Sequence, residues 1–216
     1  LSFHIISQIG YMVLGIGVAT AAGVSAGVLH LFNHALMKGA LFLALGAVAY
    51  RLGTVSLRDF AGLGWRMPWT MAAIVIGGLS LIGVPLTVGF ISKWYLVLAL
   101  LEKGWWPLTV LVLLSSLLAV IYVWRIVEWA YFAPPRIIID EVTDPPLNQL
   151  LPIWLLVFAN IYFGIDTSMT VGISALVRVK VESCLGSQPI WMTRLPSLEN
   201  ATARLDVVVL LPIPPW

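Results

Sequence analysis

Residues 28 to 46 read Val28-Leu-His-Leu-Phe-Asn-His-Ala-Leu-Met-Lys-Gly-Ala-Leu-Phe-Leu-Ala-Leu-Gly46, an apolar run that contains three titratable side chains. His30, His34 and Lys38 follow one another at intervals of four residues. Because an α-helix turns about 100° per residue, each step of four rotates by only about 40°, and the three side chains form one polar stripe. A Lys near the centre of a membrane-spanning helix costs about 2.5–3.5 kcal/mol, so the stripe is expected to face the protein interior.

A structural role is the alternative for this stripe. The two histidines would then only hydrogen-bond to neighbouring helices, and Lys38 would extend its amine to the membrane interface. Three titratable groups in register on one helical face favour the functional interpretation.

The composition is that of a polytopic membrane protein. Of the 216 residues, 60% are hydrophobic and 10% are charged, whereas about a quarter of the residues in a soluble domain are charged. The chain begins at Leu1 inside an apolar stretch, so we interpret it as part of a longer protein. One Cys excludes an internal disulfide, no Cys/His cluster has metal-ligand spacing, and the basic residues are scattered. We therefore expect no metal, no cofactor, no catalytic residue and no nucleic-acid partner.

Five apolar segments predict about five membrane spans within residues 1–178. They cover residues 3–20, 28–50, 69–101, 108–132 and 150–177. Residues 21–27 are expected to form a turn, and residues 179–216 a tail of unassigned fold. The loops at 51–68 and 133–146 carry most of the loop arginines, which favours the cytoplasmic side for both.

The third apolar segment, 69–101, is longer than the roughly 20 residues that one crossing needs. Gly83-Val84-Pro85 and Gly89 interrupt it. Because Pro85 lacks a backbone donor and clashes with the preceding turn, we expect a discontinuous helix. Lys93 follows the break in an otherwise apolar stretch. The alternative is a kinked helix with Lys93 close to its end.

Three motifs in order resemble one known family. They are Ser7-Gln-Ile-Gly-Tyr-Met12, the His30/His34/Lys38 stripe with Gly39-Ala-Leu-Phe42, and Leu79-Ser-Leu-Ile-Gly-Val-Pro85 leading to Gly89-Phe-Ile-Ser-Lys93. Together they resemble the antiporter-like membrane subunits, a family that comprises the proton-pumping subunits of respiratory complex I and the Mrp-type multisubunit cation/proton antiporters. The resemblance extends to about residue 178. Within the family, residues 78–95 are most similar to the D subunit of the Mrp-type antiporters.

The resemblance implies an all-α transmembrane bundle built from two inverted repeats, each with one discontinuous helix. This chain is similar to the second repeat and the helices that follow it. Lys38, with His30 and His34, then belongs to a central path for protons, and Lys93 is the terminal titratable residue of a half-channel. Gly83, Pro85 and Gly89 mark the broken helix.

The implied function is that of a subunit of a monovalent cation (Na⁺ or K⁺)/proton antiporter in a cell membrane, such as the bacterial inner membrane. It is a transporter subunit and not an enzyme. Its expected partners are the lipid bilayer, other membrane subunits of an antiporter or complex I-like assembly, protons, and Na⁺ or K⁺. Two alternatives stay open: a proton-translocating membrane subunit of an NADH:quinone oxidoreductase-type complex, or a truncated membrane subunit that transports nothing.

Overall fold

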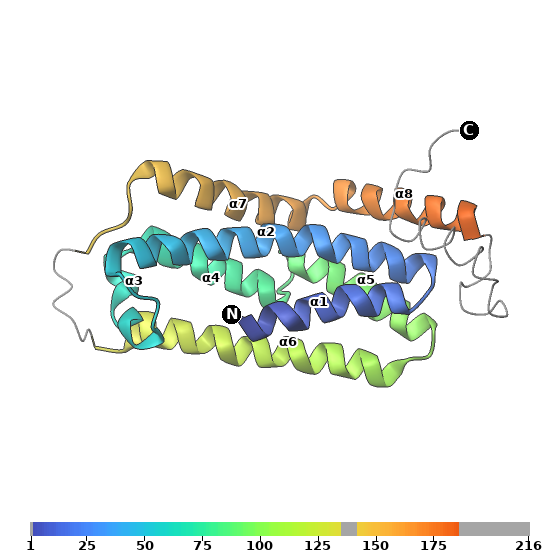
Figure 1. The fold of residues 1–216 in the computed structure, drawn as a ribbon, viewed down its shortest axis with the longest axis horizontal. Helices are drawn as coiled ribbons and strands as arrows, with labels where there is room; N and C mark the ends of the chain where they lie inside the picture. Colours follow the sequence, from blue (N-terminus) through green and yellow to red (C-terminus); the bar gives the residue numbers. More distant parts are fainter. Residues whose placement is uncertain (1, 135–141, 186–216) are drawn as a thin grey trace. The chain divides into compact units, whose positions relative to one another are not determined.

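The computed structural model describes residues 2–134 and 142–185, and every regular element in these ranges is helical. In chain order the elements are α1 (Ser2–Gly17), α2 (Ala21–Leu52), the 3-10 turn η1 (Leu57–Phe60), α3 (Leu63–Arg66), α4 (Pro68–Ile82), α5 (Val88–Glu102), α6 (Trp106–Val127), the π-helical turn η2 (Glu128–Phe132), α7 (Leu147–Ile165) and α8 (Ser168–Leu185) (Figure 1). Three helices are long and apolar enough to cross a membrane: α2, α7, and α6 together with η2. The predicted all-α membrane fold is confirmed.

The chain divides into two compact units, each built from segments that are distant in the sequence. The first unit comprises residues Leu1–Leu31, Ser92–Val112 and Thr167–Trp216, and the second comprises Phe32–Ile91 and Leu113–Asp166. Three helices, α2, α5 and α6, therefore contribute residues to both units.

In the first unit, α1 packs closely on the start of α2. The two helices come closest at Gly15, where an added Cβ would lie 2.9 Å from the Gly23 carbonyl oxygen and 2.9 Å from the Gly27 Cα. Tyr11 belongs to the small hydrophobic core of this unit, together with residues of α5 and α6. The other buried residues of this core are Val18, Ala26, Leu96, Leu100 and Val112.

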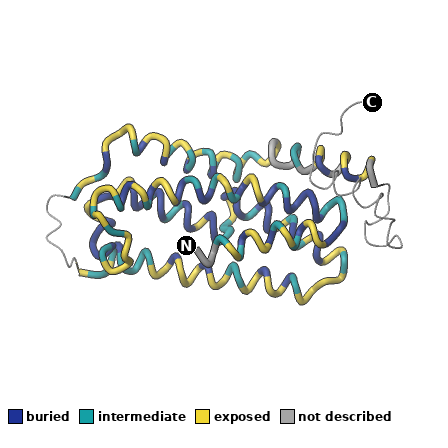
Figure 2. Tube along the Cα trace, in the orientation of Figure 1, coloured by how far each residue is buried: buried dark blue, intermediate teal, exposed yellow. Residues whose placement is uncertain are grey.

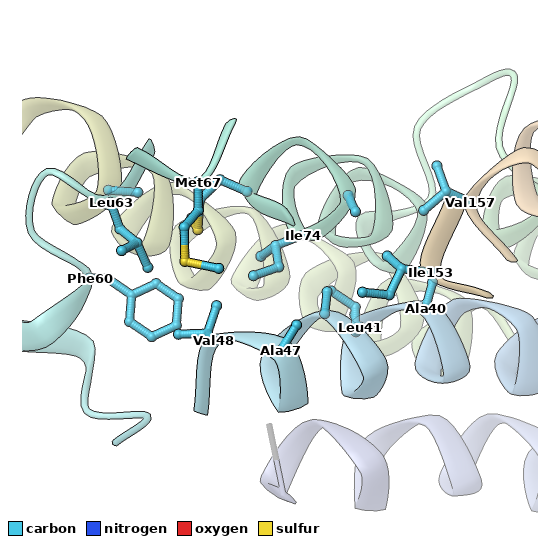
Figure 3. Close-up of a cluster of buried hydrophobic side chains, with 14 of the residues drawn as sticks. Ala40, Leu41, Ala47, Val48, Phe60, Leu63, Met67, Ile74, Ile153 and Val157 are labelled. Carbon is cyan, nitrogen blue, oxygen red and sulfur yellow. The ribbon is translucent and has the colours of Figure 1, made fainter. Parts of the chain in front are cut away.

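The second unit contains the larger core. One face of α2, with Ala40, Leu41, Ala47 and Val48, points towards residues of α3, α4 and α7 (Figure 3). Glycines in α4 allow close approach, since the Leu41 side chain lies against Gly77 and the Val123 side chain against Gly78. Most of α6 is exposed (Figure 2), as expected of a helix that faces lipid.

The predicted turn at residues 21–27 is wrong, because these residues form the first turns of α2. The hydroxyl of Thr20 accepts a hydrogen bond of 3.1 Å from the backbone N–H of Gly23. This is an N-cap interaction, which satisfies a free donor at the helix start.

The predicted end of the last span, residue 177, is also wrong, because residues 150–177 belong to two helices, of which α7 is long and apolar enough to cross a membrane. The chain leaves helical geometry at Asp166, after α7 and before α8. Helix α8 continues past residue 178, where the sequence predicts that the tail begins. The rest of that tail, residues 186–216, lies outside the described part of the chain.

The predicted discontinuous helix is present between α4 and α5. Gly83 ends α4 in the left-handed region, with φ 91, and its N–H bonds to the carbonyl oxygens of Leu79 and Ser80. Leu86 also has a positive φ of 74, which is rare for a side chain that large. Gly89 lies in the first turn of α5, just after the break.

The two arginine-containing loops meet at one end of the second unit. Asp144 accepts hydrogen bonds from the backbone N–H of Trp69 (3.2 Å) and of Thr70 (3.0 Å). The Thr70 hydroxyl also donates to Asp144, at 2.8 Å. Arg51 donates to the Asp144 backbone carbonyl at 2.8 Å. A residue from a distant loop thus caps the start of α4.

Candidate functional site

The four titratable residues that the sequence selects are divided between the two units. His30 and Lys93 belong to the first unit, and His34 and Lys38 to the second. Three of them are nearly inaccessible: His30 is 0% exposed, Lys38 5% and Lys93 7%. His34 is partly buried.

His30 is held from both sides in the first unit. Its Nε2 lies 2.8 Å from Oε1 of Gln8 on α1, and its Nδ1 lies 2.8 Å from Oγ of Ser92 on α5. Because the amide oxygen can only accept, Nε2 carries the proton in this arrangement. In the neutral ring Nδ1 then accepts from the Ser92 hydroxyl. The network assigns one tautomer to a fully buried histidine.

Tyr11 connects His30 to Lys93 within the same unit. Its ring meets the His30 ring edge-on, with centroids 5.4 Å apart. The Nζ of Lys93 lies 5.7 Å from the centroid of the Tyr11 ring. An aromatic face attracts an ammonium group without accepting its proton. The Tyr11 ring therefore lies next to both the Lys93 amine and the hydrogen-bonded ring of His30.

Lys38 is the buried cation of the second unit. Its Nζ has no hydrogen-bond partner among the described residues, and the Phe42 ring lies near it, with the centroid at 5.8 Å. A salt bridge is formed elsewhere, between the exposed side chains of Arg125 at the end of α6 and Glu128 at the start of η2. No described carboxylate holds the Lys38 amine.

Polar groups of three helices surround the break between α4 and α5, residues 83–87, in the second unit. Asn33 of α2 donates from Nδ2 to the carbonyl oxygen of Val88 at 2.8 Å. The Ser80 hydroxyl donates to Oδ1 of Asn160 on α7 at 2.7 Å, and it accepts from the Gly89 N–H at 3.3 Å. Buried polar groups normally find such partners. The break is thus fixed by side chains from α2, α4 and α7.

Asn33, Ser80 and Asn160 are not among the site residues that the sequence predicts. A buried amide or hydroxyl in an apolar span is a usable signal, since such a group needs a partner inside the protein. The sequence shows which buried polar groups need a partner, but it does not show which helices supply those partners.

Lys93 lies well inside α5 and not at its end. It follows the first residue of α5, Val88, by five positions, and the helix continues to Glu102. The kinked-helix alternative is therefore wrong, because α4 and α5 are separate helices and Lys93 is buried in the second of them.

Comparison with known proteins gives consistent matches. Residues 1–119 match the family described as NADH:quinone oxidoreductase/Mrp antiporter, TM. The chain is 44% identical over 131 residues to the N subunit of the NADH-quinone oxidoreductase of Desulforudis audaxviator, covering 61% of this chain and 26% of that protein. It is 33% identical over 164 residues to the D subunit of the Na(+)/H(+) antiporter of Alkalihalophilus pseudofirmus, covering 76% of this chain and 33% of that protein.

Among solved structures, the fold is similar to a chain in the structure of the Mrp complex from Dietzia sp. DQ12-45-1b. The TM-score is 0.75 at 21% identity, and the match covers 96% of this chain and 43% of that one. The chain thus spans 26% and 33% of the length of the two curated relatives above.

Proposed function

Because this chain belongs to the NADH:quinone oxidoreductase/Mrp antiporter transmembrane family, we propose that it is a subunit of a Na⁺ or K⁺/proton antiporter. Protons move through His30, His34, Lys38 and Lys93. The chain is a multi-pass membrane protein, and in this proposal it transports ions and performs no covalent chemistry. Its partners are the other membrane subunits of the assembly, in the cell membrane of a bacterium.

One observation carries the proposal: Lys38 is buried in an apolar helix, and its amine has no hydrogen-bond or ion-pair partner among the described residues. A buried structural lysine is normally paired, because an uncompensated charge is costly inside a protein. A lysine amine that exchanges its proton does not need a permanent counter-ion. Burial without a salt bridge at Lys38 thus supports a role in proton transfer.

His30 has the hydrogen bonds that a proton-transfer group requires. When Nδ1 gains a proton, the ring donates from both nitrogens, and the Ser92 hydroxyl turns from donor to acceptor. The hydroxyl hydrogen is then directed elsewhere. Proton uptake at one atom reverses one hydrogen bond, while Gln8 continues to accept at Nε2.

The second candidate is a proton-translocating membrane subunit of an NADH:quinone oxidoreductase-type complex. The 44% identity to the N subunit of such a complex favours it. The buried lysines and the broken helix would serve both functions, with a cation gradient or electron transfer as the driving force. The two candidates therefore differ in what drives the protons.

Everted membrane vesicles distinguish the candidates. The neighbouring membrane-subunit genes are expressed with or without this chain, and a pH-sensitive dye reports the proton gradient. Antiport predicts that adding NaCl or KCl collapses the gradient only when the chain is present. Proton uptake that needs both NADH and this chain, with no response to either salt, would establish the second candidate. Absence of both responses would indicate a subunit that transports nothing.

A further inference from the structure

Asn160 of α7 is linked to both halves of the broken helix. It is 1% exposed, and its Oδ1 accepts the Ser80 hydroxyl at 2.7 Å near the end of α4. The same hydroxyl oxygen accepts the Gly89 N–H at 3.3 Å in the first turn of α5. A single side chain therefore connects α7 to α4 and, through Ser80, to α5.

Helix α7 touches the break again one turn later. Gly164 packs directly on the backbone of Leu86 and Thr87, so closely that a Cβ at this position would overlap the Leu86 carbonyl oxygen. Residues at i and i+4 share one face of a helix. One face of α7 thus contacts the break twice, through the side-chain amide of Asn160 and through the backbone of Gly164.

The backbone conformation of the break has to be stabilised by contacts with other helices. Leu86 has φ 74, a conformation that is unfavourable for a residue with a branched side chain and that persists only where surrounding contacts hold it. The Nδ2 atom of Asn160 is buried without a hydrogen-bond partner in the described part of the chain. An unpaired buried donor costs free energy, so packing alone does not explain an amide at this position.

We propose that Asn160 is a positioning residue for proton transfer. Through Ser80 and Gly89 it holds the first turn of α5 in place. Within the same unit this turn packs on α2 next to Lys38, because the Met37 sulfur lies against Gly89 and Asn33 donates to the Val88 carbonyl oxygen. The link therefore fixes the part of the break that lies against the helix turn of the Lys38 amine. The functional part of this inference rests on the antiport proposed above.

The test compares Asn160→Ala with Ser80→Ala in the full chain, within the membrane assembly. Asn148→Ala is the matched control, because Asn148 is an exposed residue of the same type on the same helix. Hydrogen exchange is measured on peptides that cover residues 83–91, with α6 peptides as the internal reference. Each variant is expected to speed exchange in the break roughly tenfold, the scale of losing one hydrogen bond. The control leaves it unchanged.

Antiport is measured in parallel as a function of cation concentration. The maximal rate is expected to fall roughly tenfold in both variants, with the apparent KM for the cation unchanged. The double variant should be no slower than either single one, because both substitutions break the same link. Ser80→Thr, which keeps the hydroxyl, should restore both readouts.

Three results would overturn the inference. Wild-type exchange in the break of Asn160→Ala and Ser80→Ala would show that the link does not hold the break. Faster exchange with unchanged antiport would refute the positioning role. If wild-type vesicles show no antiport at all, the proposed function fails and the positioning role with it, while the exchange data still decide whether the link exists.

Discussion

Ser92 lies 2.8 Å from His30, hydroxyl oxygen to Nδ1, and this bond joins the residue before Lys93 to helix α2. Ser92→Ala removes the donor and leaves Nδ1 buried without it. We expect a loss of about 1 kcal/mol in stability and slower antiport, because Nδ1 loses its hydrogen bond and a protonated ring would lose the hydroxyl that accepts from it. Thermal unfolding of the purified assembly and vesicle antiport measure the two effects. Ser116→Ala, on α6, is the control, and an equal effect there would contradict the specific role of Ser92.

The two buried lysines are expected to tolerate neither Ala nor Arg. Lys38→Ala and Lys93→Ala remove the exchanging amine, whereas Arg retains a charge but does not release its proton. Each of the four variants should reduce antiport more than about tenfold, with the assembly intact on native gels. A structural lysine behaves differently, since Arg preserves its charge. Wild-type antiport in Lys93→Arg would therefore refute the proton-transfer role of that residue.

Gly89→Ala is expected to destabilise the break. A Cβ at this position would overlap the Ser80 carbonyl oxygen and lie 2.8 Å from the Met37 sulfur. Because backbone cannot move aside as a flexible side chain can, we expect a cost of about 1–3 kcal/mol. The loss of the folded assembly on heating measures it. Gly10→Ala should cost far less, since nothing lies within 4 Å of that site.

Asp144 should stabilise the start of α4 from a distant loop. Asp144→Ala removes the acceptor for the N–H groups of Trp69 and Thr70, and the loss of such a cap costs about 0.5–2 kcal/mol. We expect faster hydrogen exchange in the first turn of α4 only. Glu102→Ala, an exposed carboxylate at the end of α5, serves as the control. Unchanged exchange at Thr70 would show that Asp144 is dispensable there.

The broken helix could be predicted from the sequence because Gly83 and Pro85 act locally. One lacks a side chain and the other a backbone donor, so the interruption needs no knowledge of neighbouring helices. The start of α2 also has a local signal, because Thr20 is a good N-cap residue. The Gly/Ala/Ser run that follows Thr20 is nevertheless typical of a turn, and the sequence therefore predicts a turn there. The interruption between α7 and α8 lies within the polar sequence Asp166-Thr-Ser168. Three polar residues are too few to predict the end of a helix when apolar residues continue on both sides.

The partners of the buried polar groups could not be predicted. Ser80 and Asn160 are 80 residues apart, and their hydrogen bond depends on the packing of α4 against α7. Apolar membrane helices carry weak signals for which faces meet, because lipid and protein interiors are similarly apolar. The titratable stripe was recognisable from spacing on one helix, whereas the groups that hold the break come from three.

The two loops that meet at Asp144 should face the same side of the membrane. In a variant with the natural Cys184 replaced by Ser, single cysteines at Ser56 and Glu102, both exposed, report the two sides. We expect an impermeant thiol reagent to label the Glu102 site in intact cells and the Ser56 site only in everted vesicles, since arginine-rich loops face the cytoplasm. Labelling of the Ser56 site from outside would reverse the predicted topology.

The position of Lys38 along α2 has an electrical consequence. The helix runs from Ala21 to Leu52, so Lys38 lies close to its middle, about 25 Å from one end and about 21 Å from the other at 1.5 Å per residue. In the proposed proton path, a proton that reaches this amine from either surface crosses about half of the membrane voltage, which corresponds to roughly 1 kcal/mol at 100 mV. The proposal therefore predicts that the proton occupancy of Lys38 depends on the membrane potential as well as on the pH of the two compartments.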